Sequence, residues 1–380
     1  METSQATPLL TIAIPTYNRA ERLGRLLDSI LVESKSLPWP LEVVVSDNAS
    51  TDDTPQVVSA YLSRGSIKYR RNPTNLGFDR NLAAVVGCAD GEFVWLMGDD
   101  DRVAPGFLPK LGSILQTDAV DFLIVCDARE DRPLERNLAG FFGIRESVRG
   151  TLKEFLFQHG LFGILLGMGH SVFRRRAAEG FDRVAALGTC CAHVFVLARC
   201  FAERRTLFLV DTAFITPVMT RAETVSYARR LGADGLWSDG WFNGLRPLME
   251  LVDSGVFPSP VPQDVFRMNY HQNWPIHYHV YRSLAGKIGI NHPIPDEDWA
   301  LLKRFDALLG EEPYTALLNR ISECYRLRGL RGEFARASLS FVSSEPAAGP
   351  YPAALDRRLR VRELLAAVYR KCRAESRKVD

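Results

Sequence analysis

Three consecutive acids, Asp99, Asp100 and Asp101, follow the nearly unbroken apolar segment "FVWLMG" at 93–98. Repulsion between neighbouring carboxylates raises the pKa of at least one of them unless a cation or strong hydrogen-bond donors lie beside them. The arrangement therefore requires a compensating partner, and a divalent metal ion is the obvious candidate. We interpret the segment as a buried strand that ends at a metal site.

The residues that must position these acids alternate between strand-like and helix-like runs. Strand-like runs rich in β-branched and aliphatic residues occupy 9–15, 41–47, 66–71, 92–97 and 119–126, and runs with helical spacing occupy 19–31, 53–62, 78–89 and about 105–116. Such alternation predicts an α/β domain whose parallel sheet is covered by helices on both faces.

Two further polar clusters follow strands of this predicted sheet. "PTYNRAE" (15–21) comes after the first strand, and "SDNASTDDT" (46–54) ends the second. Asn18, Ser50 and Asp53 could each be a helix N-cap. Because ligands bind at the carboxyl ends of parallel strands, three polar clusters at one edge of the sheet favour a binding site over capping alone.

The pattern loosens after residue 126. "DAREDRPLERN" (127–137) has the composition of a solvated loop. The later elements are predicted as helices at 150–160 and 188–205, a short strand leading into a helix at 169–182, and mostly helices beyond about 215. A break rich in Pro, Gly and Ser at 343–352 separates a basic final helix from the rest.

Composition and charge exclude several classes of protein. The net charge of +2 on 380 residues argues against a general nucleic-acid binder. Seven cysteines without C-x-x-C spacing fit a reducing compartment, and the adjacent Cys190 and Cys191 are expected to pack. The N-terminal residues lack the features of a signal peptide, and no window approaches the roughly 18 apolar residues of a spanning helix. We therefore predict a cytoplasmic protein.

Four stretches, in order along the chain, resemble the successive motifs of inverting family 2 glycosyltransferases with the GT-A fold. They are "IAIPTYNRAERLGRLLDSI", "VVVSDNASTDDT", "NPTNLGFDRNLAAV" and "EFVWLMGDDDRVAPGFL". The resemblance covers roughly residues 9–225 and is strong up to 126. It implies a Rossmann-like, mostly parallel sheet flanked by helices in a catalytic domain at 1–215, a mainly helical acceptor or accessory region at 216–342, and a linker with a basic amphipathic helix at 343–380.

The resemblance also implies a nucleotide-sugar donor site. Its residues are Pro15, Thr16, Tyr17 and Asn18 after the first strand, Asp47, Asn48 and Ser50 after the second, and Asn75, Gly77 and Asn81 in the third motif. In similar enzymes the acid at the place of Asp47 hydrogen-bonds the nucleotide base, which favours UDP or dTDP. Gly77 permits close approach of the backbone. Asp101 is expected to ligate Mg²⁺ or Mn²⁺, with Asp99 near the ribose or sugar as a further ligand. Asp100 is expected either to assist or to bond the donor sugar.

Transfer of the sugar to an acceptor hydroxyl also requires a general base. Family members commonly place a carboxylate for this at the opening of a helix that ends in Arg. "AHVFVLAR" (192–199) occupies that place here, so that His193 stands where the acid is expected. A histidine suits the task because its unperturbed pKa near 6.5 lies close to working pH. The alternative is that His193 only packs or caps the acceptor pocket, with Asp182 as the reserve base.

Other polar residues are weaker candidates. Arg221, with Thr224 or Ser226, could contact the diphosphate from a loop, or that loop could simply be solvated. His170, in a glycine-rich passage, is a candidate for the acceptor side. Three further histidines have no nearby cysteine or carboxylate at zinc-ligand spacing and are expected to pack: His271, His277 and His279.

The basic C-terminal segment suggests what the protein could bind. Residues 355–380 hold nine Lys or Arg against four Asp or Glu. We expect the amphipathic helix within 353–380 to dock on the protein itself or on a second copy in a homodimer. The alternative is peripheral contact with the inner face of an anionic membrane, where a lipid-linked acceptor would be located. A sugar or natural-product acceptor is equally compatible with the sequence.

Two other functions compete with glycosyl transfer. A sugar-phosphate nucleotidyltransferase shares a similar sheet but needs a glycine-rich loop after the first strand, and "PTYNRAERL" (15–23) contains no glycine. A degenerate binding scaffold is suggested only by His193 in place of the acid. Retention of the acids 99–101 argues against it, because unused clustered acids are costly.

Overall fold

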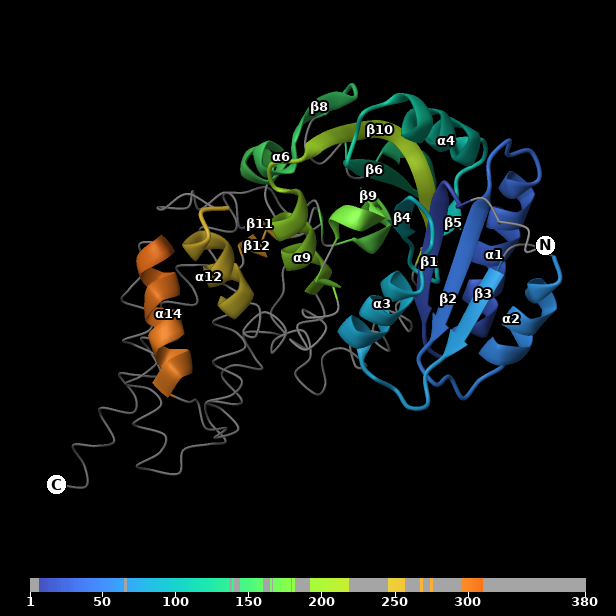
Figure 1. Ribbon diagram of the computed structural model, residues 1–380, viewed down its shortest axis with the longest axis horizontal. Coiled ribbons are helices and arrows are strands. Elements are labelled where there is room, and N and C mark those ends of the chain that lie inside the picture. The colour runs from blue at the N-terminus through green and yellow to red at the C-terminus, as the bar shows by residue number, and fades with distance from the viewer. Residues whose placement is uncertain are drawn as a thin grey trace. The chain divides into compact units, whose positions relative to one another are not determined.

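The computed structural model describes most of the chain up to residue 218 and four short stretches beyond it (Figure 1). The described residues are 7–64, 67–136, 139, 144–159, 165, 167–178, 180–181, 192–218, 245–256, 267–268, 274–275 and 296–309. The chain divides into two compact units, Met1–Val225 and Ser226–Asp380. The residues that converge on the candidate site all belong to the first unit.

Four parallel strands form one half of the sheet of the first unit. They are β1 (Leu10–Thr16), β2 (Leu41–Asp47), β3 (Ile67–Arg71) and β4 (Phe93–Leu96), in the spatial order β3-β2-β1-β4. All seven residues of β1 are buried, as expected of a central strand that helices cover on both faces. Because the strands run parallel, their carboxyl ends lie along one edge of the sheet.

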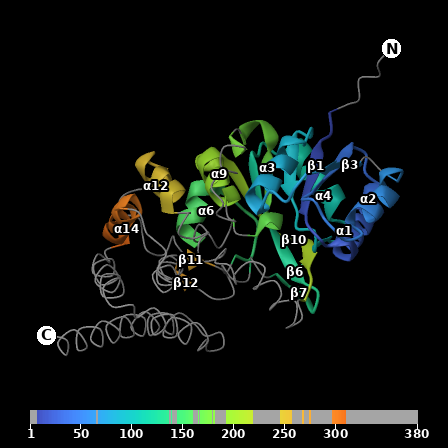
Figure 2. The same ribbon diagram turned by 90° about the horizontal axis from the view of Figure 1, so that it is seen from below.

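Four helices cover both faces of the sheet, and the first three connect these strands. They are α1 (Ala20–Ser34), α2 (Thr54–Leu62), α3 (Phe78–Gly87) and α4 (Phe107–Thr117). Helices α1, α2 and α4 bury their apolar residues in one core with alternate side chains of the strands, such as Ile12 and Ile14. Helix α3 packs on β1 and β2 from the other side, next to α9 (Ala192–Phe201) (Figures 1 and 2).

The other half of the sheet is mixed. Its strands are β5 (Arg102–Val103), β6 (Phe122–Arg129), β7 (Arg132–Arg136), β8 (Val148–Thr151), β9 (Ser171–Arg174) and β10 (Arg205–Thr216). Strand β9 lies antiparallel between β4 and β6, and β10 runs parallel to β6. Strands β5, β7 and β8 add antiparallel pairs. The α/β sheet flanked by helices is thus confirmed, with its antiparallel strands confined to this half.

Short helices complete the described part of the first unit. They are α6 (Leu152–His159) and the 3₁₀ turns η1 (Met168–His170) and η2 (Arg175–Ala177). The helix predicted at 188–205 is shorter than expected, because α9 ends at Phe201 and strand β10 begins at Arg205. Arg205, the last residue of the predicted helix, pairs instead with Thr151 of β8.

The second unit contains two described helices and a small hairpin. They are α12 (Leu245–Asp253), α14 (Asp296–Leu309), β11 (Arg267–Met268) and β12 (Trp274–Pro275). Ion pairs join α12 to α14, among them Arg304 to Asp253 at 2.6 Å. The predicted tail helix within 353–380 lies outside the described residues. None of the described helices is long and apolar enough to cross a membrane.

Candidate active site

The loop after β1 is tied to the loop after β2. The N–H of Asn18 donates to Ser50 Oγ at 2.9 Å, and Asn18 Oδ1 accepts from the N–H of Thr51 at 2.7 Å. Asn18 adopts a left-handed backbone conformation with φ of 52°, which Asn tolerates better than most residues. Tyr17 beside it is 38% exposed and presents an aromatic ring at this edge of the sheet. The first two polar clusters therefore meet, as the sequence predicts.

Asp47, at the end of β2, is fully buried and has two hydrogen-bond donors and one ion pair. The N–H of Ser50 donates to its Oδ1 at 2.8 Å, the Tyr69 hydroxyl donates to its Oδ2 at 2.7 Å, and Arg71 Nε lies 3.3 Å from the same oxygen. Burial and the hydrogen bond to Asp47 raise the pKa of Tyr69 well above its usual value, so its hydroxyl remains a donor. The carboxylate thus fixes the loop after β2 against strand β3.

Asn48 ties the third motif to the end of β2. Its amide Nδ2 donates to Asn75 Oδ1 at 2.8 Å and to the carbonyl of Gly77 at 3.2 Å, and its Oδ1 accepts from the N–H of Leu76 at 2.8 Å. Gly77, which precedes α3, has φ of 82°, a conformation that side chains disfavour. The segment Asn75–Gly77 is thereby held beside the loop after β2.

Asn81, expected in the donor site, is 3% exposed and is held by three hydrogen bonds. Its Oδ1 accepts from Ser46 Oγ at 2.7 Å and from Asn72 Nδ2 at 2.8 Å, while its Nδ2 donates to the carbonyl of Ser46 at 3.0 Å. These bonds join α3 to the end of β2. The structure therefore gives Asn81 a supporting position under the loops rather than an exposed one.

The three acids at 99–101 lie beside the loop after β1. Thr16 Oγ1 donates to Asp99 Oδ2 at 2.7 Å. Arg19 Nη1 lies 3.3 Å from Asp99 Oδ1 and 2.6 Å from Asp100 Oδ2. Asp101 closes a tight turn, because its N–H donates to the carbonyl of Gly98 at 3.2 Å. A compensating cation is therefore present among the protein's own residues, and it is Arg19.

Electrostatics single out two of these acids. Burial raises the pKa of Asp99 to about 7, opposed by Arg19 and reinforced by the charge of Asp100. Burial raises the pKa of Asp101 well above its usual value, and the charges of Asp100, Asp127 and Asp99 reinforce the shift. Asp99 and Asp101 are each 8% exposed. Partly buried carboxylates that repel one another are a donor set suited to a divalent cation.

Asp127 is a fourth acid that the sequence does not single out. The prediction of a solvated loop from residue 127 is wrong, because β6 continues to Arg129 along its partner β10. Asp127 is fully buried, close enough to Asp101 for its charge to raise the pKa of that carboxyl. The available signal was its place at the end of an apolar run, the same place that Asp47 and Asp99 occupy.

His193 lies in the first turn of α9 and is 1% exposed. Its Nε2 lies 2.9 Å from the carbonyl oxygen of Leu165. A carbonyl only accepts, so Nε2 carries the hydrogen, and in the neutral ring the proton acceptor is Nδ1. The Phe78 ring contacts the imidazole edge-on, with the centroids 6.4 Å apart.

A carboxylate does lie at the opening of α9, but it comes from another helix. Asp79 of α3 is 5% exposed, and its Oδ1 accepts from the N–H of Ala192 at 3.3 Å. An acid at this position satisfies a helix N-terminal N–H and favours the positive end of the helix dipole. Sequence patterns could not find Asp79, because the contact spans 113 residues of chain.

His170 is a core residue in this structure. It is 3% exposed, its Nδ1 lies 2.7 Å from the carbonyl of Val125, and its ring packs on Phe214 with centroids 5.1 Å apart. Several other predicted residues lie outside the described residues: Cys190, Cys191, Asp182, Arg221, Thr224, Ser226, His271, His277 and His279.

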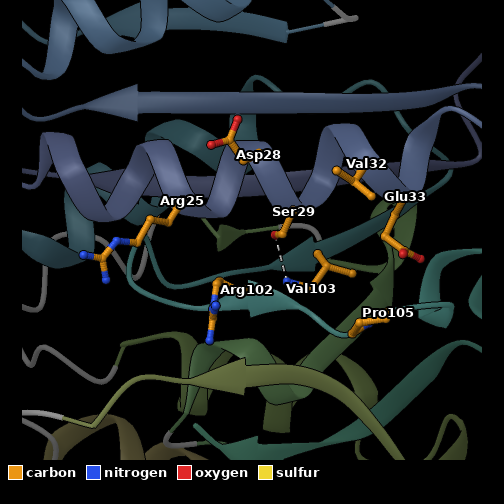
Figure 3. Close-up of a pocket in the computed structure, with 8 residues that line it drawn as sticks. All are labelled: Arg25, Asp28, Ser29, Val32, Glu33, Arg102, Val103 and Pro105. Carbon is orange, nitrogen blue, oxygen red and sulfur yellow. Dashed lines mark hydrogen bonds between the residues drawn. The ribbon is translucent and has the colours of Figure 1, made fainter.

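A surface hollow lies between α1 and residues 102–105 (Figure 3). Its lining includes Arg25 and Glu33 of α1 and Arg102 of β5, the residue after the three acids. Two hydrogen bonds cross from α1 here: the N–H of Val103 donates to Ser29 Oγ at 3.0 Å, and the N–H of Gly106 donates to a Glu33 carboxylate oxygen at 2.8 Å. Helix α1 thus holds the segment that follows the acids.

The sequence of this region matches a known family. Residues 11–179 fit the family model described as Glycosyl transferase family 2. This segment belongs to glycosyl transferase family 2. The family 2 segment contains β1 to β6 and the three acids, and His193 lies beyond its end.

Curated relatives match over short segments. Abequosyltransferase RfbV of Salmonella typhimurium is 41% identical over 124 residues, which are 32% of this chain and 36% of that protein. Validoxylamine A glucosyltransferase of Streptomyces hygroscopicus subsp. jinggangensis is 50% identical over 62 residues, which are 16% of this chain and 14% of that protein. The chain thus matches about a third or less of the length of these relatives.

Solved structures extend the likeness of the fold. Residues 1–349 of TarS from Staphylococcus aureus, crystallised in complex with UDP-GlcNAc, superpose with a TM-score of 0.53 at 17% identity. The superposition covers 84% of this chain and 91% of that one. At this identity the likeness shows the fold alone, and that fold is the GT-A fold that the sequence predicts.

Proposed function

We propose that this chain is an inverting glycosyltransferase that moves a sugar from a nucleoside diphosphate to an acceptor hydroxyl. The observation that carries the proposal is the meeting, at one edge of the sheet, of the loops after β1 and β2 with the acids 99–101. Membership of family 2 and the activities in the names of the relatives RfbV and validoxylamine A glucosyltransferase support it.

The nucleotide is proposed to lie on the loops after β1 and β2, between Tyr17 and the segment Asn75–Gly77. The exposed ring of Tyr17 offers a surface on which a base can stack. Asp47 accepts three contacts, and a carboxylate has about four acceptor positions, so one remains for the N3–H of uracil or thymine. Because Asp47 is fully buried, that contact requires a neighbouring side chain to rotate aside. The preference for UDP or dTDP rests on this residue.

Asp101 and Asp99 are proposed to hold Mg²⁺ or Mn²⁺ together with the diphosphate. The described residues contain no group of three or more His, Cys, Asp or Glu side chains arranged around a metal position. One or two carboxylates completed by phosphate oxygens and water are, however, a usual arrangement for Mg²⁺. When bound, the ion would stabilise the negative charge that grows on the leaving diphosphate.

His193 is proposed as the base that takes the proton of the acceptor hydroxyl. Its Nε2–H is engaged by the Leu165 carbonyl, so Nδ1 would receive the proton. Because the side chain is 1% exposed, the acceptor must displace neighbouring groups to reach it. The competing interpretation is a packing histidine, and Asp182 is the reserve base.

Turnover separates the proposed function from its alternatives. Purified protein is incubated with UDP- and dTDP-sugars, with and without Mn²⁺, and release of nucleoside diphosphate is measured. A nucleotidyltransferase would instead release pyrophosphate from a nucleoside triphosphate and a sugar phosphate. A degenerate scaffold would bind a nucleotide sugar, detected as a rise in melting temperature, without turnover with any acceptor. Either result would contradict the proposal.

The base is tested by His193→Gln. The amide nitrogen of glutamine can take the place of Nε2 and donate to the Leu165 carbonyl, but the amide cannot act as a base at working pH. We expect kcat to fall by roughly 10²–10⁴-fold, with donor affinity nearly unchanged. His170→Asn is the matched control, because His170 is as buried and also meets a backbone carbonyl. Near-wild-type turnover by His193→Gln would remove His193 from the mechanism.

A further inference from the structure

Arg19 occupies the position between the nucleotide loop and the acids. It immediately follows Asn18, and its Nη1 contacts both Asp99, at 3.3 Å, and Asp100, at 2.6 Å. Arg22, one turn along α1, lies 3.8 Å from the same Asp100 oxygen. Two guanidinium groups thus face the acids from one helix.

These contacts use oxygen atoms that a metal ion would need. A divalent cation ligates carboxylate oxygens directly, at about 2.0–2.2 Å for Mg²⁺, and would stand next to a guanidinium held by the same groups. Two cations so close repel each other, and the repulsion is strong where the carboxylates are sheltered from water. A metal ion and Arg19 therefore compete for Asp99.

Arg19 can leave the acids without moving the chain. Its backbone is fixed, because the N–H of Ala20 donates to Asp52 Oδ2 at 3.1 Å and the N–H of Leu23 donates to the carbonyl of Arg19 at 3.0 Å. The side chain is 21% exposed, so part of it already faces solvent. A released guanidinium in this position would meet the phosphates of a bound nucleotide, and its planar fork suits phosphate oxygens.

We propose that Arg19 is an internal counter-cation of Asp99 and Asp100, which a divalent metal displaces and which then contacts the diphosphate. The proposal rests on the proposed function and adds to it a positioning residue outside the acids. In the metal-free protein Arg19 offsets the repulsion among the carboxylates. When the metal and the diphosphate are bound, the same side chain neutralises charge on the diphosphate. The Arg19 guanidinium thus balances negative charge both with and without these ligands.

The alternative role is permanent support, in which Arg19 holds the carboxylates in place for the metal. The two roles predict opposite changes in the affinity for the metal when Arg19 is replaced. Loss of a competitor strengthens metal binding in the absence of nucleotide, whereas loss of a support weakens it. The change in affinity for the nucleoside diphosphate then tests the contact between Arg19 and the diphosphate independently.

The test uses the full-length chain and two titrations, one with Mn²⁺ alone and one with UDP or dTDP in the presence of saturating Mn²⁺. Arg19→Gln is expected to bind Mn²⁺ alone about tenfold more tightly than the wild type and the nucleoside diphosphate about tenfold more weakly, since charge-assisted hydrogen bonds are worth about that factor or more. Arg19→Lys keeps the charge without the planar fork of the guanidinium. Its affinities for Mn²⁺ and for the nucleoside diphosphate should therefore lie between those of the wild type and those of Arg19→Gln.

Arg25→Gln is the matched control. Arg25 lies on the same helix, its side chain is 61% exposed, and it pairs with Glu21 rather than with the acids. It lines the hollow of Figure 3. This variant removes the same charge, so both affinities should equal those of the wild type. Melting temperatures of all variants verify folding, and Arg19→Lys carries the test if Arg19→Gln unfolds.

Weaker or unchanged Mn²⁺ binding in Arg19→Gln would overturn the proposal, as would failure of both proteins to bind Mn²⁺. Unchanged nucleotide affinity would overturn the contact with the diphosphate. Failure of the proposed function looks different: the wild type would bind no nucleoside diphosphate and transfer no sugar, while the change in Mn²⁺ affinity caused by Arg19→Gln could still be measured.

Discussion

Replacement of Asn81 by alanine separates support of the donor site from direct contact with the donor. Asn81 lies under the loops, joined to Ser46 by two hydrogen bonds and to Asn72 by one. Alanine removes all three bonds and leaves polar atoms of Ser46 buried without them, since Ser46 is fully buried. We therefore expect Asn81→Ala to act first on stability.

The size of the effect follows from these contacts. Each hydrogen bond contributes a net stability of about 0.5–1.5 kcal/mol, and buried groups left unsatisfied place the loss towards the upper part of that range. Three bonds give a loss of about 3 kcal/mol. For a unit of this size the melting temperature falls by about 2–4 °C per kcal/mol, so a decrease of about 6–12 °C is expected.

Thermal denaturation of the metal-free protein measures this loss, and titration with UDP or dTDP measures the effect on the site. Asn75→Ala is the matched control, because Asn75 is exposed and its loss should change the melting temperature little while weakening nucleotide binding. An Asn81→Ala protein with the wild-type melting temperature but no nucleotide binding would refute the reasoning and make Asn81 a direct ligand.

Three further outcomes are expected. Asp101→Ala should abolish transfer and metal-dependent nucleotide binding without loss of the fold, whereas activity that survives both EDTA and this change would exclude a metal role. Asp79→Ala removes the acceptor at the opening of α9, so unfolding experiments should show a loss of about 1 kcal/mol, as for other helix N-caps, and an unchanged stability would contradict the capping role. Because the folded-state pKa of Asp99, about 7, exceeds its usual value, the folded protein retains a proton that the unfolded chain releases between about pH 4 and 7. Denaturant titrations without metal should therefore show stability falling as pH rises through this interval, and a stability that rises there would contradict the shift.

The position of the loops could be predicted from the sequence because it follows from a general rule. Parallel strands end at one edge of a sheet, so residues after β1, β2 and β4 must converge. Asn18 meets Ser50, and Thr16 meets Asp99, as this rule requires. Local patterns were sufficient here since each element is short, strongly apolar and directly followed by its polar cluster.

Residues whose role depends on contacts between distant segments could not be predicted. Asp127 reads as the start of a polar loop, and only the pairing of β6 with β10 makes it part of a buried strand. Asp79 reads as a first-turn acid of its own helix, yet it accepts a hydrogen bond from the first turn of α9. Neither contact leaves a periodicity in the sequence. The antiparallel insertion of β9 between β4 and β6 is hidden for the same reason.

Helix α1 is held at both ends. Near its far end Ser29 and Glu33 bind the segment after the acids, and at its near end, beside Arg19, the N–H of Ala20 donates to Asp52. Ten residues of helix between Ser29 and Arg19 span about 15 Å, so a tilt of only about 4° about Ser29 displaces Arg19 by about 1 Å. Such a displacement is enough to break a hydrogen bond of ordinary length. A small tilt of one surface helix would therefore change the charge balance among the acids while the sheet stays still.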